Sequence, residues 1–220
     1  MLQYIRNLTN FILDCLSPED KRVERWLRLE PLEALRRLPK PRAIDRPGLC
    51  ALFDYRDDKV RTLVRAMKYR GNRAVIKRMA NYLYEEIIEF ASDLSLFAGA
   101  DKIIIVPMPI SDKRRSKRGW SQCELLCAEI QKLGGSEMFV RFDILKKVRD
   151  TKKQTDLKRE ERLLNVKNSM KAIENFKLKI ENCSVIVVDD VYTTGATFAE
   201  AKRALEAAGT KKVFGFFLAH

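Results

Sequence analysis

The stretch SVIVVDDVYTTGATFAEAKRAL, residues 184–205, predicts a strand, an acidic pair, a turn and a helix in succession. Its apolar run ends at the adjacent carboxylates Asp189 and Asp190, and a helical pattern begins at Ala196. A continuous apolar run is typical of a strand that is buried on both faces of a parallel sheet. Ligands of such open sheets bind beyond the carboxyl ends of the strands. We therefore expect a ligand site at the two aspartates.

The turn after the acids indicates what the ligand carries. A helix N-terminus presents unpaired backbone N–H groups and a partial positive charge, which favour a phosphate. Glycine allows close approach of the backbone, and threonine hydroxyls can donate hydrogen bonds. We assign the phosphate to Thr193, Thr194, Gly195, Ala196 and Thr197. Asp189 and Asp190 would instead accept hydrogen bonds from a sugar diol or hold a divalent cation, so the stretch predicts a ribose 5-phosphate group.

Other interpretations of this stretch fit less well. A Walker A loop ends in Gly-Lys-Ser/Thr, and a dinucleotide fingerprint reads G-x-G-x-x-G; the sequence contains neither pattern. A phospho-receiver domain can begin with a strand ending in two aspartates, but only 30 residues follow Asp190. The acids could simply cap the turn and helix. An adjacent acidic pair before T-T-G-A-T favours the ligand site over capping alone.

Along the whole chain, expected strands alternate with expected helices. This order predicts an α/β fold with a mostly parallel sheet, flanking helices and a short N-terminal helical segment. The Pro-rich stretch PKPRAIDRPG, residues 39–48, predicts a linker, so we expect an N-terminal extension at 1–48 and one domain at 49–220. Strands are expected at 49–55, 102–106, 138–145, 185–188 and 213–218, and helices at 2–16, 17–38, 57–70, 73–90, 120–133 and 196–208.

The net charge of +13 is concentrated in two segments that we interpret as loops. SDKRRSKR, residues 111–118, carries +4, and residues 146–167 carry +5. Such clusters favour an anionic partner such as phosphate, pyrophosphate or nucleic acid. The five cysteines are scattered and odd in number, which favours a reducing cytoplasm over a disulfide framework. The polar residues of the N-terminal stretch argue against a signal peptide, and no apolar run approaches the ~20 residues that span a bilayer.

Four segments resemble known proteins. VIVVDDVYTTGAT, residues 185–197, resembles the phosphoribosyl-pyrophosphate (PRPP) motif of type I phosphoribosyltransferases. Residues 51–74, which end in KYRGNRA, and residues 106–126, VPMPISDKRRSKRGWSQCELL, resemble two blocks of the ComF/GntX family. A third block, Arg-x-Thr-x-x-Gln-x-x-Leu-x-x-x-x-Arg-x-x-Asn, matches at Arg149, Thr151, Gln154, Leu157, Arg162 and Asn165. The resemblance covers the whole of the second expected domain.

This resemblance implies a type I phosphoribosyltransferase-like α/β fold. It also implies a glycosyltransferase that binds Mg-PRPP and transfers its phosphoribosyl group with release of pyrophosphate. It implies catalytic roles for Asp190, Lys68 and Arg118. Pyrophosphate would contact the loop Pro107–Ser111 and a mobile loop at 146–168, where cations stabilise the leaving group. The residues assigned to pyrophosphate or to the mobile loop are Lys68, Arg70, Arg149, Gln154 and Arg162.

The resemblance also sets expectations for cofactors and partners. Mg²⁺ would arrive with PRPP, and Asp189 is the candidate protein ligand. Many family members carry a four-cysteine zinc module, but the first 50 residues here hold only Cys15 and Cys50, so no zinc is predicted. We expect Cys123 and Cys127 to be buried thiols. The expected partners are PRPP and an unidentified nucleobase or other acceptor, with weak single-stranded nucleic acid and a second copy of the chain as further candidates, and no membrane.

A competing hypothesis remains open at this point. Family members are associated with DNA uptake in competent bacteria, so the protein could be a non-catalytic PRPP sensor or a competence factor associated with single-stranded DNA. The positive charge supports this hypothesis. The scarcity of aromatic residues argues against it, because residues 111–168 contain only Trp120, Phe139 and Phe142.

Overall fold

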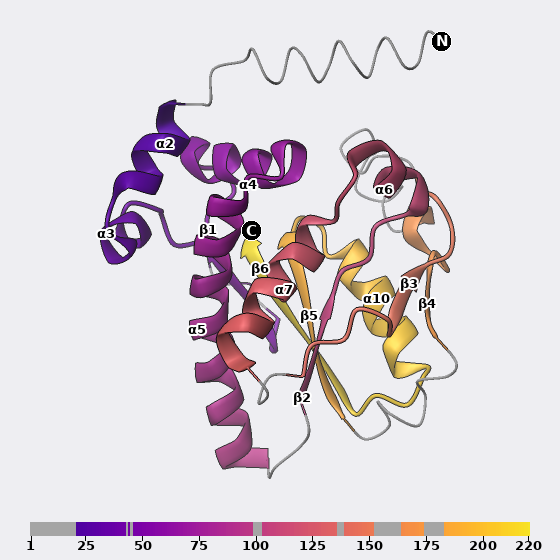
Figure 1. Ribbon diagram of the computed structural model, residues 1–220. Coiled ribbons are helices and arrows are strands. Elements are labelled where there is room, and N and C mark those ends of the chain that lie inside the picture. Colours follow the sequence, from indigo (N-terminus) through magenta and orange to yellow (C-terminus); the bar gives the residue numbers. More distant parts are fainter. Residues whose placement is uncertain are drawn as a thin grey trace, which may run out of the picture.

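A parallel sheet of four strands forms the centre of the protein (Figure 1). The computed structural model describes residues 21–42, 44, 46–98, 103–135, 139–151, 164–173 and 183–220, with backbone only for 95–98. Strand order is β1-β6-β5-β2, and each neighbouring pair is parallel. The strands are β1 (Leu49–Phe53), β2 (Ile103–Pro107), β5 (Ser184–Val191) and β6 (Lys212–Ala219). The predicted α/β class with a mostly parallel sheet and flanking helices is confirmed.

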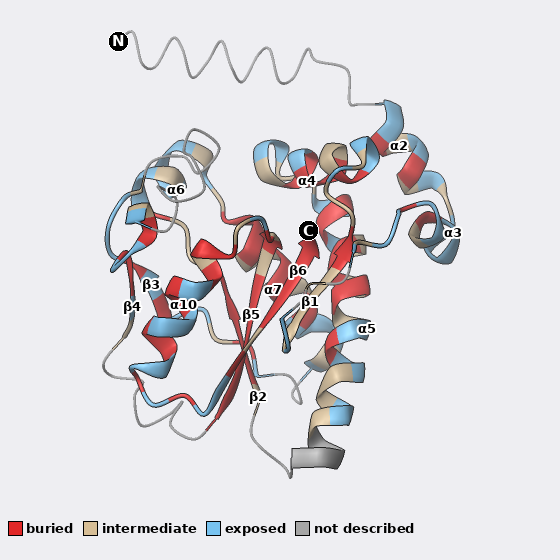
Figure 2. Cartoon of the chain, turned by 180° about the vertical axis from the view of Figure 1, so that it is seen from behind, coloured by how far each residue is buried: buried red, intermediate tan, exposed pale blue. Residues whose placement is uncertain are grey.

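Helices cover both faces of this sheet, and Figure 2 shows the strands almost entirely buried. Ile186 and Val188 join the cluster formed with α5 (Arg73–Ala98) and α7 (Gln122–Gly134) on one face. Val185 and Val187 join the cluster formed with α10 (Ala196–Glu206) on the other. Burial of both faces explains why the sequence of β5 is an apolar run rather than an alternating one.

The helix α4 (Asp58–Arg70) has clear signals at both ends. The Asp57 carboxylate accepts hydrogen bonds from the backbone N–H groups of Lys59 and Val60. Gly71 ends the helix in the left-handed region with a φ of 59°, and a Cβ there would lie 3.0 Å from the ring of Trp120. The indole Nε1 of Trp120 donates to the carbonyl of Met67 at 3.2 Å. Trp120 is half-buried and packs on the end of α4.

The basic segment 111–118 is a helix, not the expected loop. The Ser111 hydroxyl accepts from the N–H of Arg114, α6 spans Asp112–Arg118, and Gly119 closes the helix with a φ of 85°. Lysine and arginine favour helices, and the serine and glycine supply both caps, so local signals that we interpreted as surface charge define a helix.

The region 138–145 also differs from the prediction of a strand. Val140 forms only an isolated parallel bridge with Ile105, and the next strand is β3 (Leu145–Lys147). This strand pairs antiparallel with β4 (Met170–Ala172), which the sequence did not indicate. The pairing joins segments on either side of the basic stretch 152–163, so it depends on a long-range contact that local periodicity cannot reveal.

Two short helices precede the sheet, α2 (Lys21–Arg28) and α3 (Pro31–Arg36). They pack against α5, where Arg78 donates to the carbonyl of Trp26 at 2.9 Å and Tyr82 donates to that of Pro31 at 2.6 Å. The expected helix at 2–16 lies outside the described residues, and the domain boundary after residue 48 stays a prediction. Across the described part of the chain, no helix combines the length and apolar character needed to cross a membrane.

Candidate functional site

The end of β5 brings the two aspartates to one edge of the sheet. The backbone N–H of Met108, which follows β2, donates to the carbonyl of Val188 at 2.8 Å. The backbone N–H of Tyr192 donates to the carbonyl of Ala219 on β6 at 2.8 Å. The two neighbouring strands therefore hold the end of β5 between them. Figure 1 shows α4 and α6 beyond this edge. The site therefore lies at the carboxyl ends of the strands, as the sequence predicts.

Asp190 is the buried member of the acidic pair, with 4% of its surface exposed. Its Oδ2 lies 2.7 Å from Lys68 Nζ and accepts from Gln122 Nε2 at 3.0 Å. Burial opposes the charged form, but the ion pair with Lys68 outweighs burial and lowers the pKa of Asp190. Burial also opposes the ammonium of Lys68, whereas Asp190 and Asp189 raise its pKa. Both groups are therefore charged at neutral pH.

Asp189 is half-buried and has a different environment. Its Oδ1 accepts from the thiol of Cys123 at 3.3 Å and from the backbone N–H of Asp190 at 2.8 Å. Burial and the neighbouring Asp190 carboxylate raise the pKa of Asp189 to about 7. The two acids are thus unequal, because one is charged within a buried ion pair and the other changes protonation near neutral pH.

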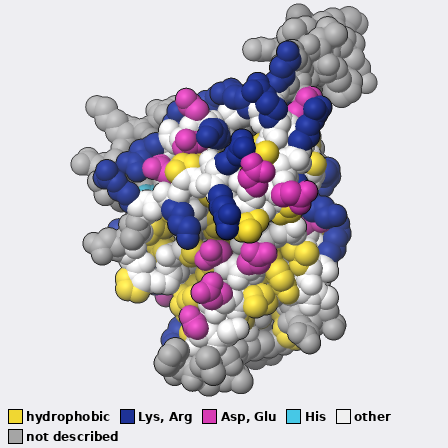
Figure 3. Space-filling model, turned by 90° about the vertical axis from the view of Figure 1, so that its left-hand side faces the viewer, with side chains coloured by type: hydrophobic (Ala, Val, Ile, Leu, Met, Phe, Trp, Pro, Cys, Tyr) yellow, Lys and Arg dark blue, Asp and Glu magenta, His cyan; other side chains and the backbone are white. Residues whose placement is uncertain are grey.

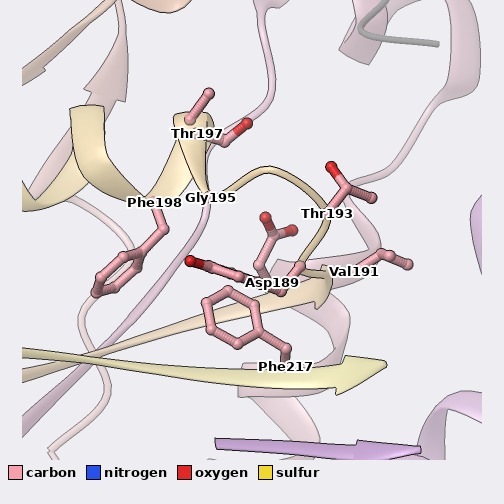
Figure 4. A pocket seen from close by; sticks show the side chains of 9 residues that line it. Asp189, Val191, Thr193, Gly195, Thr197, Phe198 and Phe217 are labelled. Atoms are coloured by element: carbon pink, nitrogen blue, oxygen red, sulfur yellow. The ribbon is translucent and has the colours of Figure 1, made fainter. Parts of the chain in front are cut away.

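A pocket lies between Asp189 and the loop that follows it (Figure 4). The carboxylate of Asp189 points toward the arch of the loop between Thr193 and Gly195. Thr197 lies on the first turn of α10, and the rings of Phe198 and Phe217 lie on the side away from the arch. The pocket is lined by Asp189, Val191, Tyr192, Thr193, Gly195, Ala196, Thr197, Phe198 and Phe217. The structure therefore brings together Asp189 and most of the residues that we assigned to the phosphate.

The loop leaves donor groups at the start of α10 without a side-chain cap. Gly195 occupies the cap position with a φ of 76°, and no side chain there accepts from the first N–H groups of the helix. Within the described residues, the buried hydroxyl of Thr194 also has no hydrogen-bond partner. Uncapped N–H groups and an unpartnered hydroxyl at one helix start are suited to an anion.

The other residues that we assigned to catalysis or to pyrophosphate lie in different parts of the chain. Arg118 donates to Gln122 Oε1 at 2.6 Å and lies over the exposed ring of Tyr69, so it is connected to Asp190 through Gln122. Arg70 lies exposed in the last turn of α4. Arg149 donates to the carbonyls of Asn165 and Lys167 at 3.0 and 2.8 Å, which joins the two ends of the basic segment. Gln154 and Arg162 lie outside the described residues.

Lys68 contacts Asp190 and is not among the residues that line the pocket at loop 193–197. Sequence reasoning also missed two partners of the acids, Gln122 and Cys123. Both lie in the first turn of α7, which begins after Ser121, and both fall within the block 106–126. The only available signal was that resemblance, because the residue types themselves are ordinary for a helix.

The cysteines and acids of the described residues offer no metal site of three or more ligands. Cys123 and Cys127 are buried, as expected, and burial raises the pKa of both thiols. Cys15, the other cysteine of the N-terminal segment besides Cys50, lies outside the described part. The absence of zinc stays a prediction.

Comparison with known proteins identifies relatives of the chain. Competence protein ComFC of Bacillus subtilis is 30% identical over 155 residues, which cover 70% of this chain and 56% of ComFC. DNA utilization protein YhgH of Salmonella typhimurium is 27% identical over 172 residues, covering 76% of this chain and 71% of YhgH. These relatives confirm the resemblance to the ComF family. The match with ComFC of B. subtilis spans little more than half of that protein's length.

Two other comparisons add less. No protein-family model matches the chain. Among solved structures, a hypoxanthine phosphoribosyltransferase from Staphylococcus aureus aligns with a TM-score of 0.37 and 11% identity, over 64% of this chain and 62% of that chain. A similarity at this level does not by itself establish substrate or activity.

Proposed function

We propose that the protein binds Mg-PRPP at the carboxyl edge of the sheet and transfers its phosphoribosyl group to an acceptor. In this reaction the bond from C1 of the ribose to pyrophosphate breaks, and pyrophosphate leaves with the electron pair. A nucleophilic atom of the acceptor forms the new bond to C1. The observation that carries the proposal is the uncapped start of α10 in a pocket that also contains Asp189.

The arrangement fits the two ends of ribose 5-phosphate. The phosphate would accept hydrogen bonds from the N–H groups at residues 195–197 and from the threonine hydroxyls. The Asp189 carboxylate would accept a hydrogen bond from a ribose hydroxyl. Asp190 is held by Lys68 and Gln122, so its role in this proposal is to fix the position of the acidic pair.

The residues at the site also fit a magnesium ion that arrives with the ligand. Mg²⁺ usually keeps several waters and binds through one or two carboxylates together with substrate phosphates. Asp189 provides one such carboxylate, whereas Lys68 neutralises the other. When bound, Mg²⁺ would neutralise charge on the pyrophosphate; the protein residues orient the ribose and the 5-phosphate.

Binding and catalysis need separate tests. Isothermal titration with Mg-PRPP should show binding, and Asp189→Asn should weaken it. Release of pyrophosphate from PRPP in the presence of a panel of nucleobases tests transfer. A protein that fails to bind Mg-PRPP at concentrations that saturate a phosphoribosyltransferase would contradict the whole proposal. Binding without pyrophosphate release would support PRPP binding by the protein and contradict the transfer reaction.

A second candidate function is supported by the names of the relatives. ComFC is named a competence protein and YhgH a DNA utilization protein. Figure 3 shows Lys and Arg side chains gathered over the upper part of the face that carries α2 to α5, with acidic and apolar side chains below. A basic surface of this kind supports weak binding of a single-stranded nucleic acid. The protein would then connect PRPP binding to DNA uptake without catalysis.

A gel-shift experiment with single-stranded DNA discriminates between the two functions. It should be run near physiological salt, with and without excess PRPP. Tight DNA binding that PRPP does not change would favour the second function. Weak binding that salt removes would favour the enzyme, because nonspecific phosphate contacts are the most sensitive to salt.

A further inference from the structure

His220 is the only histidine in the chain, and no motif in the sequence indicated a role for it. It follows β6 at the carboxyl edge of the sheet and is half-buried. Its backbone N–H donates to the carbonyl of Phe53 on β1 at 3.0 Å, and its carbonyl accepts from the N–H of Tyr55 at 2.9 Å. The end of the neighbouring strand therefore fixes the backbone of His220 at the edge that carries the candidate site.

The side chain of His220 contacts the residue that precedes the loop 193–197. Its Nδ1 lies 3.0 Å from the carbonyl oxygen of Tyr192. A carbonyl oxygen can only accept, so Nδ1 carries the hydrogen and donates it to Tyr192. The two rings also meet edge to face, with their centroids 5.4 Å apart. His220 therefore holds both the backbone and the ring of Tyr192.

Tyr192 packs directly against the loop 193–197. It has 7% of its surface exposed, and the centroid of its ring lies 4.8 Å from that of Phe217 on β6. A Cβ at position 195 would lie only 2.4 Å from the Tyr192 hydroxyl oxygen, so the end of the tyrosine ring rests against Gly195. Tyr192 also lines the pocket. A displacement of this ring would therefore move Gly195 and the N–H groups that follow it at the start of α10.

The loop is held at both of its ends. On the side of α10, the N–H of Ala199 donates to the carbonyl of Gly195 at 2.8 Å. On the side of β6, the N–H of Tyr192 donates to Ala219, and His220 donates to the carbonyl of Tyr192. Backbone donors bind an anion well only when their directions are already fixed, because ordering a loop during binding lowers the affinity. The contacts at Tyr192 supply that order before a ligand arrives.

We propose that His220 is a positioning residue for the 5-phosphate of the ligand. It holds Tyr192, and Tyr192 keeps Gly195 in the conformation that directs the N–H groups of residues 195–197 toward the phosphate. This inference rests on the proposed PRPP site and gives a role to two residues outside the phosphate assignment at 193–197. His220 acts through Tyr192 and does not touch the ligand. Its loss should therefore affect the phosphate end of the ligand and leave the diphosphate end unchanged.

The two ends of the ligand can be tested as separate half-ligands. Isothermal titration of the full chain with ribose 5-phosphate measures one end, and titration with inorganic pyrophosphate and Mg²⁺ measures the other. His220→Ala removes the hydrogen bond and the ring contact, and it should weaken ribose 5-phosphate binding ~10-fold, as expected for the loss of one hydrogen bond. Pyrophosphate binding should stay within ~2-fold of wild type, because distant sites act independently.

Two further variants separate the hydrogen bond from general stability. The side-chain nitrogen of His220→Asn can occupy the position of Nδ1 and donate to the same carbonyl, so this variant should recover most of the affinity. Amide hydrogen exchange of residues 193–197 should be faster in His220→Ala and close to wild type in His220→Asn. Val213→Ala removes part of a buried side chain at the opposite end of β6. It should lower the thermal stability without changing the affinity for ribose 5-phosphate.

The outcomes also separate this inference from the proposed function. A wild type that binds ribose 5-phosphate, with an affinity that His220→Ala leaves unchanged, would overturn the inference and leave the proposed function in place. The inference would also be wrong if His220→Asn bound as weakly as His220→Ala, since the hydrogen bond would then not be the cause. Equal weakening by Val213→Ala would assign the effect to stability alone and reject the inference. Failure of the wild type to bind either half-ligand would overturn both proposals.

Discussion

Two regions of the molecule carry donor groups that suit an anion, and they differ in how they are built. The loop 193–197 uses backbone N–H groups and hydroxyls at the start of one helix, and it contains no lysine or arginine. The cluster of Arg114, Lys147 and Thr151 uses charged side chains from two elements, and Thr151 lies 37 positions after Arg114 in the sequence. Backbone donors cannot change protonation, whereas a buried ammonium can. The comparison teaches that pH and salt should affect the two ends of one ligand differently.

The largest effect is expected at Asp190, which is paired with Lys68 beside the first region. Asp190→Asn would remove the partner of Lys68 and should destabilise the fold by about 3 kcal/mol, near the lower limit for a broken buried pair. The lower limit applies because 27% of the Lys68 side chain is exposed. Denaturation by urea measures the change in the free energy of unfolding.

Asp189→Asn is the matched control for that variant. Because the pKa of Asp189 is raised to about 7, the folded state binds more protons than the unfolded state between pH 4 and 7. The stability that this group contributes is therefore lost as the pH rises through that range. At pH 7.5 the Asp189→Asn variant, which has a neutral side chain at this position, should be as stable as the wild type. Equal destabilisation by both substitutions would show that the acids are equivalent, against the structure.

The next effect tests the loop 193–197, whose donors include backbone N–H groups. A Cβ at position 195 would lie 2.4 Å from the Tyr192 hydroxyl oxygen, and the φ of 76° adds strain for any residue except glycine. Gly195→Ala should therefore weaken ribose 5-phosphate binding ~100-fold, about 2.7 kcal/mol, while pyrophosphate binding persists. Titration with each half-ligand measures this separation.

Gly119→Ala controls for backbone strain. Gly119 has a φ of 85°, but a Cβ there would meet no atom within 4 Å. This variant should cost about 1 kcal/mol of stability and leave ribose 5-phosphate affinity unchanged. If it weakened ribose 5-phosphate as much as Gly195→Ala, strain in the fold rather than the shape of the loop would explain both results.

A smaller effect distinguishes the cationic cluster by pH. The pKa of Lys147 is about 8 in the folded protein, below its value in an unfolded chain. Between pH 8 and about 10 the unfolded state binds more protons, so the free energy of unfolding should rise with pH, by about 1–3 kcal/mol in total. Lys147→Met should lack this rise, and Lys146→Met should retain it. Urea midpoints across this pH range test the prediction, and a rise that persists in Lys147→Met would contradict it.

The smallest effect concerns the contact between α10 and the β3–β4 hairpin. Glu200 of α10 accepts from the backbone N–H of Met170 on β4 at 3.2 Å and pairs with Arg203 at 2.8 Å. Glu200→Gln keeps the shape and removes the charge, and it should cost about 1 kcal/mol. Hydrogen exchange of residues 170–172 should become faster, while Lys202→Met, on the exposed side of α10, should leave it unchanged. Unchanged exchange in Glu200→Gln would show that the hairpin is held by other contacts.

The sequence predicted much of this architecture and less of the site. Apolar runs identified β2, β5 and β6 because strands buried on both faces have no polar positions. The helix pattern identified α4 and most of α5. The β3–β4 hairpin was missed because its strands have three residues each, and their pairing is nonlocal. The helix α6 was predicted to be a loop because its high charge was taken as the sign of a surface loop. The helix-capping residues Ser111 and Gly119 were overlooked.

The sequence by itself determined the position of the loop 193–197 and the donor groups that it carries. A strand, two acids, a hydroxyl-rich turn and a helix start are contiguous, so their local order already fixes where the N–H groups and carboxylates lie. Only the tertiary structure decided that Asp189 and Asp190 are unequal, because Lys68, Gln122 and Cys123 reach them from two other helices. The same holds for Lys147, which is buried on β3 and shares the partner Thr151 with Arg114 of α6, a residue far from it in the sequence. Charge in the sequence indicates an anionic partner, but burial and neighbours decide which cations are placed to bind it.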